Sequence, residues 1–322
     1  MALSTNPEEL VKEMLGGGRG ALARLISLAE GGRINTIELL SGSKALKATP
    51  SVIGITGPPG AGKSTLADKL VEKFRARGTK VGVIAIDPSS PFTGGALLGD
   101  RVRMGSHSND EGVFIRSLGS RGSLGGLSRA TGDIIRLMSA FGAGCVLVET
   151  VGVGQSELDI AGVADTVVVV LVPESGDSIQ TMKAGIMEIG DVFVVNKSDR
   201  KNAESLAAEI SGTLSIRASR GDWSIPVLLT KATSGKGVSE LALQIEKHGD
   251  FLRKSGFLEE KRFVRTRKDL MDEVKGILGS LAEDTLKDGA SGAGIVSAVL
   301  EGGVTIPDGA TKIAALITKA GK

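Results

Sequence analysis

The feature that most constrains the fold of this chain is a glycine-rich run of eight residues from Gly57 to Ser64. The run matches the pattern G-x-x-x-x-G-K-[ST] at every fixed position, and it stands between an apolar run at 52–56 and a helical pattern at 64–77. Glycines allow backbone N–H groups to turn inward around phosphate oxygens, and the amino end of a helix adds partial positive charge. The run therefore predicts a strand–loop–helix unit that binds the phosphates of a nucleotide.

Each residue of this loop is assigned a part in phosphate binding. Lys63 is expected to contact the β- and γ-phosphates and to act in catalysis, and the Ser64 hydroxyl is expected to bind Mg²⁺. The alternative is a glycine-rich turn without a ligand, which requires all the fixed positions to match by chance. The predicted phosphate-binding residues are Gly57, Pro58, Pro59, Gly60, Ala61, Gly62, Lys63, Ser64 and Thr65.

Strand and helix patterns alternate through residues 51–230. The expected strands are 52–56, 80–86, 145–148, 166–172, 192–195 and 227–229, and the expected helices are 64–77, 124–141, 179–189 and 203–214. This alternation predicts an α/β fold of the P-loop NTPase type, with a mostly parallel central sheet flanked by helices. Ligands of such sheets bind at the carboxyl ends of the strands.

Helical patterns also flank this region on both sides. Residues 1–50 are predicted to be an N-terminal helical extension, 51–250 the nucleotide-binding domain, and 251–322 a C-terminal helical arm. The arm carries an apolar stripe of helical spacing, which indicates either a core contact or a dimer contact. The residues of the stripe are Leu270, Val274, Ile277, Leu278 and Leu281.

The composition argues against several classes of function. The formal net charge is only +2 and aromatic residues are 3% of the chain, with no tyrosine, so we expect no nucleic-acid partner. No apolar run reaches the roughly 18 residues that span a bilayer, and the acidic N-terminus lacks the pattern of a signal peptide. A single cysteine, Cys145, permits no intramolecular disulfide. We therefore expect a cytoplasmic protein without a membrane partner.

A second motif, Asn196-Lys197-Ser198-Asp199, follows the apolar run at 192–195. It matches N-K-x-D, in which the aspartate carboxylate accepts both donors on the Watson–Crick edge of guanine. Adenine lacks this pair of donors and leaves the carboxylate unpaired, so discrimination can be steep. Asn196 and Lys197 are expected to order the loop against the base and the phosphate loop. The alternative is a charged turn, which the position of the motif after a late strand disfavours.

The loop after the last expected strand is a third candidate contact with the nucleotide. GTPases place here a loop whose backbone N–H meets guanine O6, usually with the pair Ser-Ala. In this chain the pair is Lys231-Ala232, followed by Thr233. Ala232 fits the pattern and Lys231 departs from it. We assign these three residues to guanine binding, with a plain glycine-rich turn as the alternative.

Acidic residues near the ends of expected strands are the candidates for Mg²⁺ binding, together with Ser64. Asp87 ends the second strand, and Asp100 lies in the Gly- and Ser-rich stretch that follows, which is typical of a switch. A turn-forming aspartate is the alternative for both. Glu149 occupies the place where GTPases usually have the aspartate of D-x-x-G, and Gly152 is the glycine whose N–H senses the γ-phosphate.

The residue that usually orients the attacking water is missing from its place, since no glutamine directly follows Gly152. Gln155 stands three residues later and can serve in catalysis only if the loop moves. We therefore expect slow hydrolysis by the chain alone and stimulation by a partner. A polar stretch at 173–185 follows the next strand, and as bare sequence it is either a further switch or a solvated helix start.

Four stretches together resemble the MeaB/ArgK family of P-loop GTPases, also described as LAO/AO transport system ATPases. The stretches are 54–65, 85–101, 148–157 and 195–199. The third contains E-T-V-G-V-G-Q-S-E, which is highly specific, and in this family Glu149 is a regular feature. The chain is similar to the mitochondrial methylmalonic aciduria type A protein as well.

The resemblance implies a homodimeric GTPase chaperone of an adenosylcobalamin-dependent mutase, usually methylmalonyl-CoA mutase. GTP binding and hydrolysis in this family gate cofactor loading and protect the mutase, and cobalamin itself is expected on the mutase and not on this chain. The resemblance also implies a third switch loop, which here carries Asp177, Gln180 and Lys183, with Lys183 in a catalytic role. It is looser outside 50–240, where the C-terminal arm diverges.

Two other functions remain open. An ATPase or kinase linked to lysine, arginine or ornithine transport is suggested by the older family name, although the N-K-x-D motif disfavours ATP. A nickel-insertion GTPase belongs to a related class, but such factors usually carry Cys/His metal motifs. In this sequence His107 and His248 stand isolated, and no cluster has metal-ligand spacing.

Overall fold

The computed structural model describes residues 6–41, 49–88, 107, 109–120, 126–150, 156–173, 185–216, 222–288 and 290–320. Within it the chain forms two compact units, Met1–Lys261 and Arg262–Lys322. The first unit contains the sheet and the candidate site, and the second is helical.

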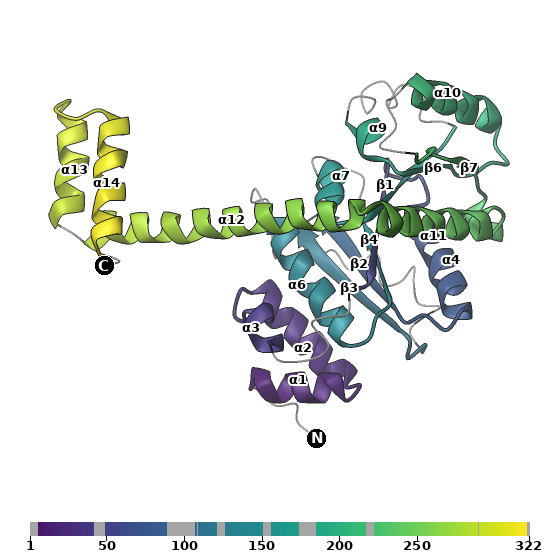
Figure 1. The fold of residues 1–322 in the computed structure, drawn as a ribbon, viewed down its shortest axis with the longest axis horizontal. Coiled ribbons are helices and arrows are strands. Elements are labelled where there is room, and N and C mark those ends of the chain that lie inside the picture. The colour runs from purple at the N-terminus through teal and green to yellow at the C-terminus, as the bar shows by residue number, and fades with distance from the viewer. Residues whose placement is uncertain are drawn as a thin grey trace. The chain divides into compact units, whose positions relative to one another are not determined.

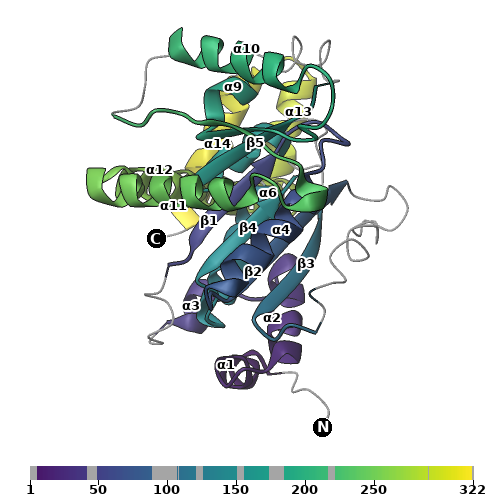
Figure 2. The ribbon, with the colours of Figure 1, turned by 90° about the vertical axis from the view of Figure 1, so that its right-hand side faces the viewer.

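A seven-stranded parallel sheet is the centre of the first unit (Figures 1 and 2). The strands are β1 (Ser51–Thr56), β2 (Val81–Pro88), β3 (Val113–Ser120), β4 (Cys145–Glu149), β5 (Thr166–Leu171), β6 (Val192–Val195) and β7 (Val227–Leu229). Their order is β3-β2-β4-β1-β5-β6-β7, and every neighbouring pair runs parallel. Because β1 lies between β4 and β5, the glycine-rich loop leaves the sheet near its middle. The predicted α/β fold is confirmed.

Helices cover both faces of the sheet, and each face has its own apolar core. The helices α4 (Lys63–Ala76) and α11 (Val238–Ser255) pack on one face, and α6 (Gly126–Ala140) and α10 (Ala203–Ile216) pack on the other. Side chains along β5 alternate between these cores, with Val168 joining α4 and Val169 joining α6. Since both faces of each central strand are covered, the strands read as continuous apolar runs in the sequence.

Three helices precede the sheet: α1 (Pro7–Leu15), α2 (Arg19–Glu30) and α3 (Thr36–Leu40). The Asn6 side chain caps α1 by accepting a hydrogen bond from Glu8 N at 3.0 Å, and Asn35 caps α3 in the same way. Their buried faces share a core with α6. Arg19 also donates to the backbone oxygen of Val113 at 2.7 Å, which fastens these helices to β3.

Strand β3 is an element that the sequence analysis did not predict. It lies at the edge of the sheet and pairs with β2. Phe114, Ile115, Arg116 and Ser117 are only partly buried. A half-buried edge strand that contains arginine and serine lacks the continuous apolar run that identifies the central strands. The list of expected strands therefore left out residues 113–120.

Four short elements lie near the carboxyl ends of the strands or on the way back to the sheet. They are α7 (Ser156–Asp159), the 3₁₀ helix η3 (Ile160–Gly162), α9 (Ile186–Ile189) and the 3₁₀ helix η4 (Ala232–Ser234). Of the helix predicted at 179–189, residues 186–189 form α9, and 179–184 lie outside the described residues.

The second unit is made of helices. Helix α12 (Phe257–Asp288) begins in the first unit and continues into the second, where α13 (Ala290–Leu300) and α14 (Ile306–Ala320) pack against each other. The apolar stripe on α12 is exposed by 39–63% at its five predicted positions. Among the described residues, no helix combines the length and the hydropathy needed to cross a membrane.

Candidate nucleotide-binding site

The glycine-rich loop joins the end of β1 to the start of α4, as the sequence predicts. Gly57 has φ 138° and Gly62 has φ 86°, conformations that other residues rarely adopt. A Cβ atom on Gly57 would lie 2.0 Å from the oxygen of Val170, and one on Gly62 would lie 2.5 Å from Asn196 Nδ2. Both glycines are therefore required by backbone conformation and by close packing against neighbouring strand ends.

Lys63 stands at the first position of α4 and is 5% exposed. Its ammonium group donates hydrogen bonds to the backbone oxygens of Gly57 at 2.7 Å and Pro58 at 2.9 Å. The amine thus lies inside the loop that is predicted to surround phosphate oxygens. Carbonyl oxygens that hold an ammonium group can be replaced by phosphate oxygens, which carry more negative charge.

Ser64 and Glu149, two of the predicted Mg²⁺ ligands, are brought together. The Ser64 hydroxyl donates to Glu149 Oε1 at 2.6 Å, and Glu149 ends β4 with 5% exposure. Hydroxyl and carboxylate oxygens at the carboxyl edge, beside a phosphate loop, are the donor set that Mg²⁺ prefers. The residues present therefore fit the ion that the sequence implies.

Other predicted metal and switch residues cannot be placed in this way. Asp87 lies near the end of β2, two positions beyond Ala85, which pairs with Glu149. Its side chain lies outside the described part of the structure. The residues wholly outside the described ranges are Asp100, Gly152, Gln155, Asp177, Gln180 and Lys183.

Asn196, the first residue of the N-K-x-D motif, connects three loops and is 2% exposed. Its Nδ2 donates to the backbone oxygen of Ala61 in the phosphate loop at 2.8 Å. Its Oδ1 accepts from Thr230 Oγ1 and from Ala232 N, each at 3.1 Å. The phosphate loop, the end of β6 and the loop after β7 are therefore built as one unit.

Asp199 and Lys231 form an ion pair with Lys231 Nζ 3.0 Å from Asp199 Oδ2. The hydrogen bond from Lys231 holds the pKa of Asp199 below its usual range, so the carboxylate is ionised at neutral pH. Both side chains are exposed, and the carboxylate that is predicted to meet guanine is accessible from solvent. Lys231, which departs from the usual serine, therefore neutralises the acid that is predicted to recognise the base.

The remaining guanine-binding predictions concern the backbone. Lys197 adopts φ 56°, a left-handed conformation that turns the chain sharply between β6 and Asp199. Ala232 is buried, and its N–H is engaged with Asn196, not open to the base. Thr233 lies exposed in η4. Their predicted contacts with guanine stay predictions.

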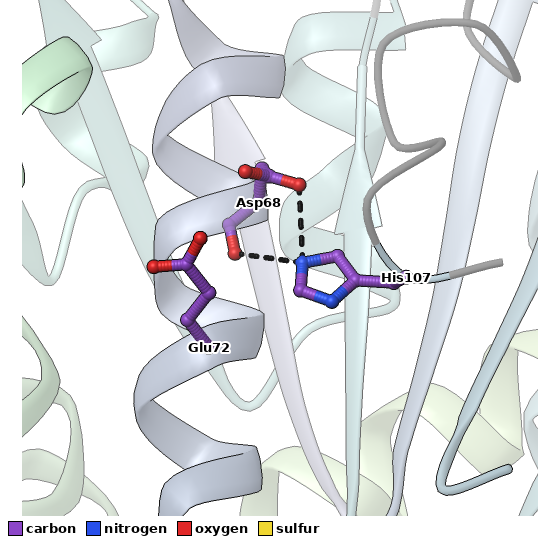
Figure 3. A group of neighbouring side chains, drawn as sticks. All are labelled: Asp68, Glu72 and His107. Atoms are coloured by element: carbon purple, nitrogen blue, oxygen red, sulfur yellow. Dashed lines mark hydrogen bonds and ion pairs between the residues drawn. The ribbon is translucent and has the colours of Figure 1, made fainter. Parts of the chain in front are cut away.

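A second group of ligand-type side chains, Asp68, Glu72 and His107, lies on and beside α4, away from the glycine-rich loop (Figure 3). His107 places Nε2 3.0 Å from Asp68 Oδ1 and 3.3 Å from Asp68 O, and Glu72 is paired with Lys69 at 2.5 Å. These contacts indicate that the group is structural and holds His107 against α4. His107 stands isolated in the sequence because Asp68 is 39 positions away.

Sequence reasoning assigned no role to two buried threonines and one buried acid at the carboxyl edge. Thr150 Oγ1 donates to Thr56 Oγ1 at 3.0 Å, which joins the ends of β4 and β1. Glu157 in α7 is 7% exposed. The sequence signal for these residues was a threonine that ends one apolar strand or directly follows another, and an acid soon after the predicted Gly152 loop.

Comparisons with known proteins show what the chain as a whole is similar to. The family described as methylmalonyl-CoA mutase-associated GTPase MeaB matches residues 22–285. A putative GTPase of Pyrococcus abyssi is 50% identical over 88% of this chain and 88% of its own length. A mitochondrial methylmalonic aciduria type A homolog of Caenorhabditis elegans is 34% identical over 84% of this chain and 72% of its own length. The crystal structure of an LAO/AO transport system kinase has a TM-score of 0.69 at 26% identity and covers 99% of both chains.

Proposed function

Because the chain belongs to the MeaB family of methylmalonyl-CoA mutase-associated GTPases, we propose that it is a GTP-hydrolysing chaperone of an adenosylcobalamin-dependent mutase. Its cycle gates the loading of adenosylcobalamin onto methylmalonyl-CoA mutase or a related acyl-CoA mutase, and protects that enzyme. The chain acts in the cytoplasm, and cobalamin stays on the mutase. Isobutyryl-CoA and ethylmalonyl-CoA mutases are related candidates for the partner.

Phosphate binding rests on the loop from Gly57 to Gly62 and on the two residues after it. Lys63 turns from the carbonyl oxygens of Gly57 and Pro58 to the β- and γ-phosphates of GTP. Ser64 and Glu149, which contact each other, would hold Mg²⁺. The ion, when bound with the nucleotide, neutralises charge on the phosphate oxygens.

Base selection rests on Asp199. Its ionised carboxylate accepts the two donors on the Watson–Crick edge of guanine, which adenine does not offer. Lys231 has to leave or share Oδ2 when the base arrives, because it occupies this oxygen at 3.0 Å. Asn196 transmits the position of the base loop to the phosphate loop through its contacts with Ala232 and Ala61.

The single observation that carries this proposal is the buried side chain of Asn196. Its three hydrogen bonds join a phosphate loop to a guanine-type motif and to the loop after β7. A site that binds only phosphate, or a nucleotide of any base, has no need of this connection. The arrangement supports a guanine nucleotide, and the family supports the mutase as the protein that responds to it.

The experiment that tests the proposal measures GTP hydrolysis by the full chain, alone and with methylmalonyl-CoA mutase. Slow turnover alone and marked stimulation by the mutase are expected. Lys63→Ala should remove both, whereas Lys73→Ala, ten residues further along α4, serves as the matched control. Absence of GTP binding by the wild-type chain would contradict the proposal.

We propose also that the chain is a homodimer through the exposed apolar stripe of α12. Five large apolar residues between Leu270 and Leu281 are 39–63% exposed, and such a stripe on a helix usually marks a contact between proteins. Light scattering should give twice the chain mass of 33.0 kDa. A pair of glutamate substitutions at Leu270 and Ile277 should halve that mass, and an unchanged mass would overturn this assignment.

A kinase or ATPase linked to amino-acid transport is the second candidate, favoured by the structural similarity to the LAO/AO transport system kinase. The two candidates differ in the base they accept. Competition of ATP and GTP for the same site, followed with a fluorescent nucleotide, separates them. Equal affinity for both bases would favour the transport-linked enzyme.

A further inference from the structure

Glu157 is a buried acid at the carboxyl edge of the sheet that the proposed function leaves unused. It lies in α7 with 7% exposure. Among the described residues, its Oε1 has no hydrogen-bond partner. A buried carboxyl oxygen without a partner is unfavourable unless a ligand or a water supplies the missing contact. The feature therefore leaves a water or a ligand as the missing partner.

The backbone of Glu157 is held where such a partner would bind. The Thr56 hydroxyl donates a hydrogen bond to the backbone oxygen of Glu157 at 3.4 Å. The Thr150 hydroxyl in turn donates to Thr56 Oγ1 at 3.0 Å. Both threonines have no exposed surface. Thr56 directly precedes Gly57 of the phosphate loop, and Thr150 directly follows Glu149. Glu157 is thus attached to the two strand ends that carry the phosphate loop and the predicted Mg²⁺ ligand.

The side chain of Glu157 lies close to Lys63 of the phosphate loop. Burial raises the pKa of Glu157, and the charge of Lys63 acts in the opposite direction, which requires the two groups to be near each other. Lys63 is held at the phosphate loop by Gly57 and Pro58. The carboxyl group therefore lies near the ammonium group that is predicted to contact the terminal phosphates of a nucleotide.

We propose that the Glu157 carboxylate positions the water that attacks the γ-phosphate of GTP. This inference rests on the proposed GTPase function and deepens it. The carboxylate accepts a hydrogen bond from the water and directs its oxygen at the γ-phosphorus. The new oxygen–phosphorus bond forms as the bond to the β,γ-bridging oxygen breaks, GDP leaves, and the proton of the water ends on inorganic phosphate. An ionised carboxylate accepts a stronger hydrogen bond than a neutral amide, so the amide of Glu157→Gln is expected to orient the water poorly.

A second buried acid indicates what a purely structural carboxylate looks like in this protein. Asp165 is 5% exposed and lies at the amino end of the sheet, where its Oδ2 accepts from Val52 N at 3.1 Å. The hydrogen-bond partner of this carboxylate oxygen is thus the backbone of β1 itself. Glu157 lies at the opposite end of the same strand, with an oxygen that the described protein does not occupy. Asp165→Asn is therefore a matched control for Glu157→Gln.

The test compares wild type, Glu157→Gln, Glu157→Asp and Asp165→Asn as full chains. Single-turnover GTP hydrolysis is measured with the mutase at saturation, beside the affinities for GDP and for GDP with aluminium fluoride, a mimic of the transferred phosphoryl group. Glu157→Gln should lower the hydrolysis rate by about 100-fold, keep GDP affinity within about threefold, and lose the extra affinity for the fluoride complex. Glu157→Asp should recover part of the rate, and Asp165→Asn should hydrolyse GTP at close to the wild-type rate.

Each outcome decides the inference separately from the proposed function. Wild-type hydrolysis with a Glu157→Gln rate within threefold of it would overturn the role of Glu157 and leave the GTPase standing. A parallel fall of GDP affinity and hydrolysis in Glu157→Gln and Glu157→Asp would also overturn it, because that pattern indicates a structural residue. A wild-type chain that binds no GTP would instead overturn the proposed function.

Discussion

The two ends of the parallel sheet contain polar residues of similar kinds, but these residues have different kinds of partners. At the amino ends, Asp191 Oδ2 accepts from Val167 N at 2.9 Å, His248 Nδ1 is 2.8 Å from Thr166 Oγ1, and Lys261 donates to the oxygen of Asp165 at 2.9 Å. These partners are strand backbone or neighbouring side chains. They are satisfied within the fold, and nothing in these contacts calls for a ligand.

At the carboxyl ends the same kinds of groups meet loops. Lys63 is held by loop carbonyl oxygens, Glu149 by the first turn of α4, and Asp199 by Lys231 from another loop. In the proposed function these contacts are exchanged for phosphate oxygens at Lys63, for Mg²⁺ at Glu149 and for the donors of guanine at Asp199. The comparison teaches that burial alone does not distinguish stability from binding. The decisive property is whether the partner is regular backbone or a loop atom that a ligand can replace.

The largest effect is expected from Lys63→Ala at the carboxyl end. It should reduce GTP hydrolysis by about 1,000-fold, because one donor aimed at developing phosphate charge contributes two to three orders of magnitude. The unfolding free energy should change by less than about 1 kcal/mol, as measured by urea denaturation. If Lys63→Ala instead lost much stability and kept hydrolysing GTP, the carboxyl-end contact would serve stability and not ligand binding.

Asp199→Asn should weaken GTP binding by at least about 100-fold. The reason is that the asparagine side chain can no longer accept both donors of guanine, and the loss of such a pairing reduces affinity steeply. Xanthosine triphosphate should bind the variant better than GTP, because the asparagine amide donates to the carbonyl group that replaces the guanine amino group. Fluorescent-nucleotide competition measures both affinities, with the exposed Asp222→Asn as control. Unchanged GTP affinity in Asp199→Asn would remove Asp199 from base recognition.

The third prediction concerns pH and the amino end. Burial lowers the pKa of His248 from 6.5 to about 4, so the unfolded chain binds a proton in a range where the folded chain does not. The contribution of His248 to the free energy of unfolding is therefore fully present above pH 6.5. On the order of 3 kcal/mol of it is lost as the pH falls towards 4. Urea denaturation between pH 7 and 4.5 should give a shallower pH dependence for His248→Gln than for wild type. Parallel curves would contradict a neutral, buried His248.

Asp191→Ala should destabilise the fold by about 2 kcal/mol, because it leaves the Val167 N–H without its acceptor in a buried region. It also removes contacts with His248 and Lys261, which lie 3.5 and 3.4 Å from its carboxylate. GTP affinity should stay within about threefold of wild type. Thermal denaturation and nucleotide binding test both parts, and Asp250→Ala, on the surface of α11, is the control.

The smallest effect is expected from Lys231→Ser. The pair with Asp199 is exposed and weak, but it competes with guanine for Asp199 Oδ2. Its removal should raise GTP affinity by about threefold and leave thermal stability unchanged. A fall in affinity would indicate that Lys231 contacts the base itself, and would sharpen the description of the carboxyl end.

Much of the candidate site was predictable because its chemistry lies in consecutive residues. The loop from Gly57 to Ser64 combines backbone conformation, a helix start and a cation in one short run, so local sequence suffices. The central strands were predictable for a similar reason, since burial on both faces requires a continuous apolar run. Strand β3 was missed because an edge strand needs apolar residues on only part of its surface.

The rest depends on residues that are distant in the sequence. Asn196 meets Ala61 across 135 positions, and the Ser64 hydroxyl meets Glu149 across 85. The pairing of Lys231 with Asp199 and of His107 with Asp68 was not foreseen either. No local pattern contains such contacts, because they arise from the order in which parallel strands are placed side by side.

The sequence by itself determined the parallel sheet, and it predicted the class of ligand and the end of the sheet at which that ligand would bind. These follow from backbone conformation and hydrophobic periodicity, which act over a few neighbouring residues. Only the tertiary structure decided which buried acids are satisfied and which keep an oxygen without a partner among the described residues, as Asp165 and Glu157 demonstrate. The physical reason is that the stability of a buried polar group depends on the atoms packed around it, and packing joins segments that the linear sequence keeps apart.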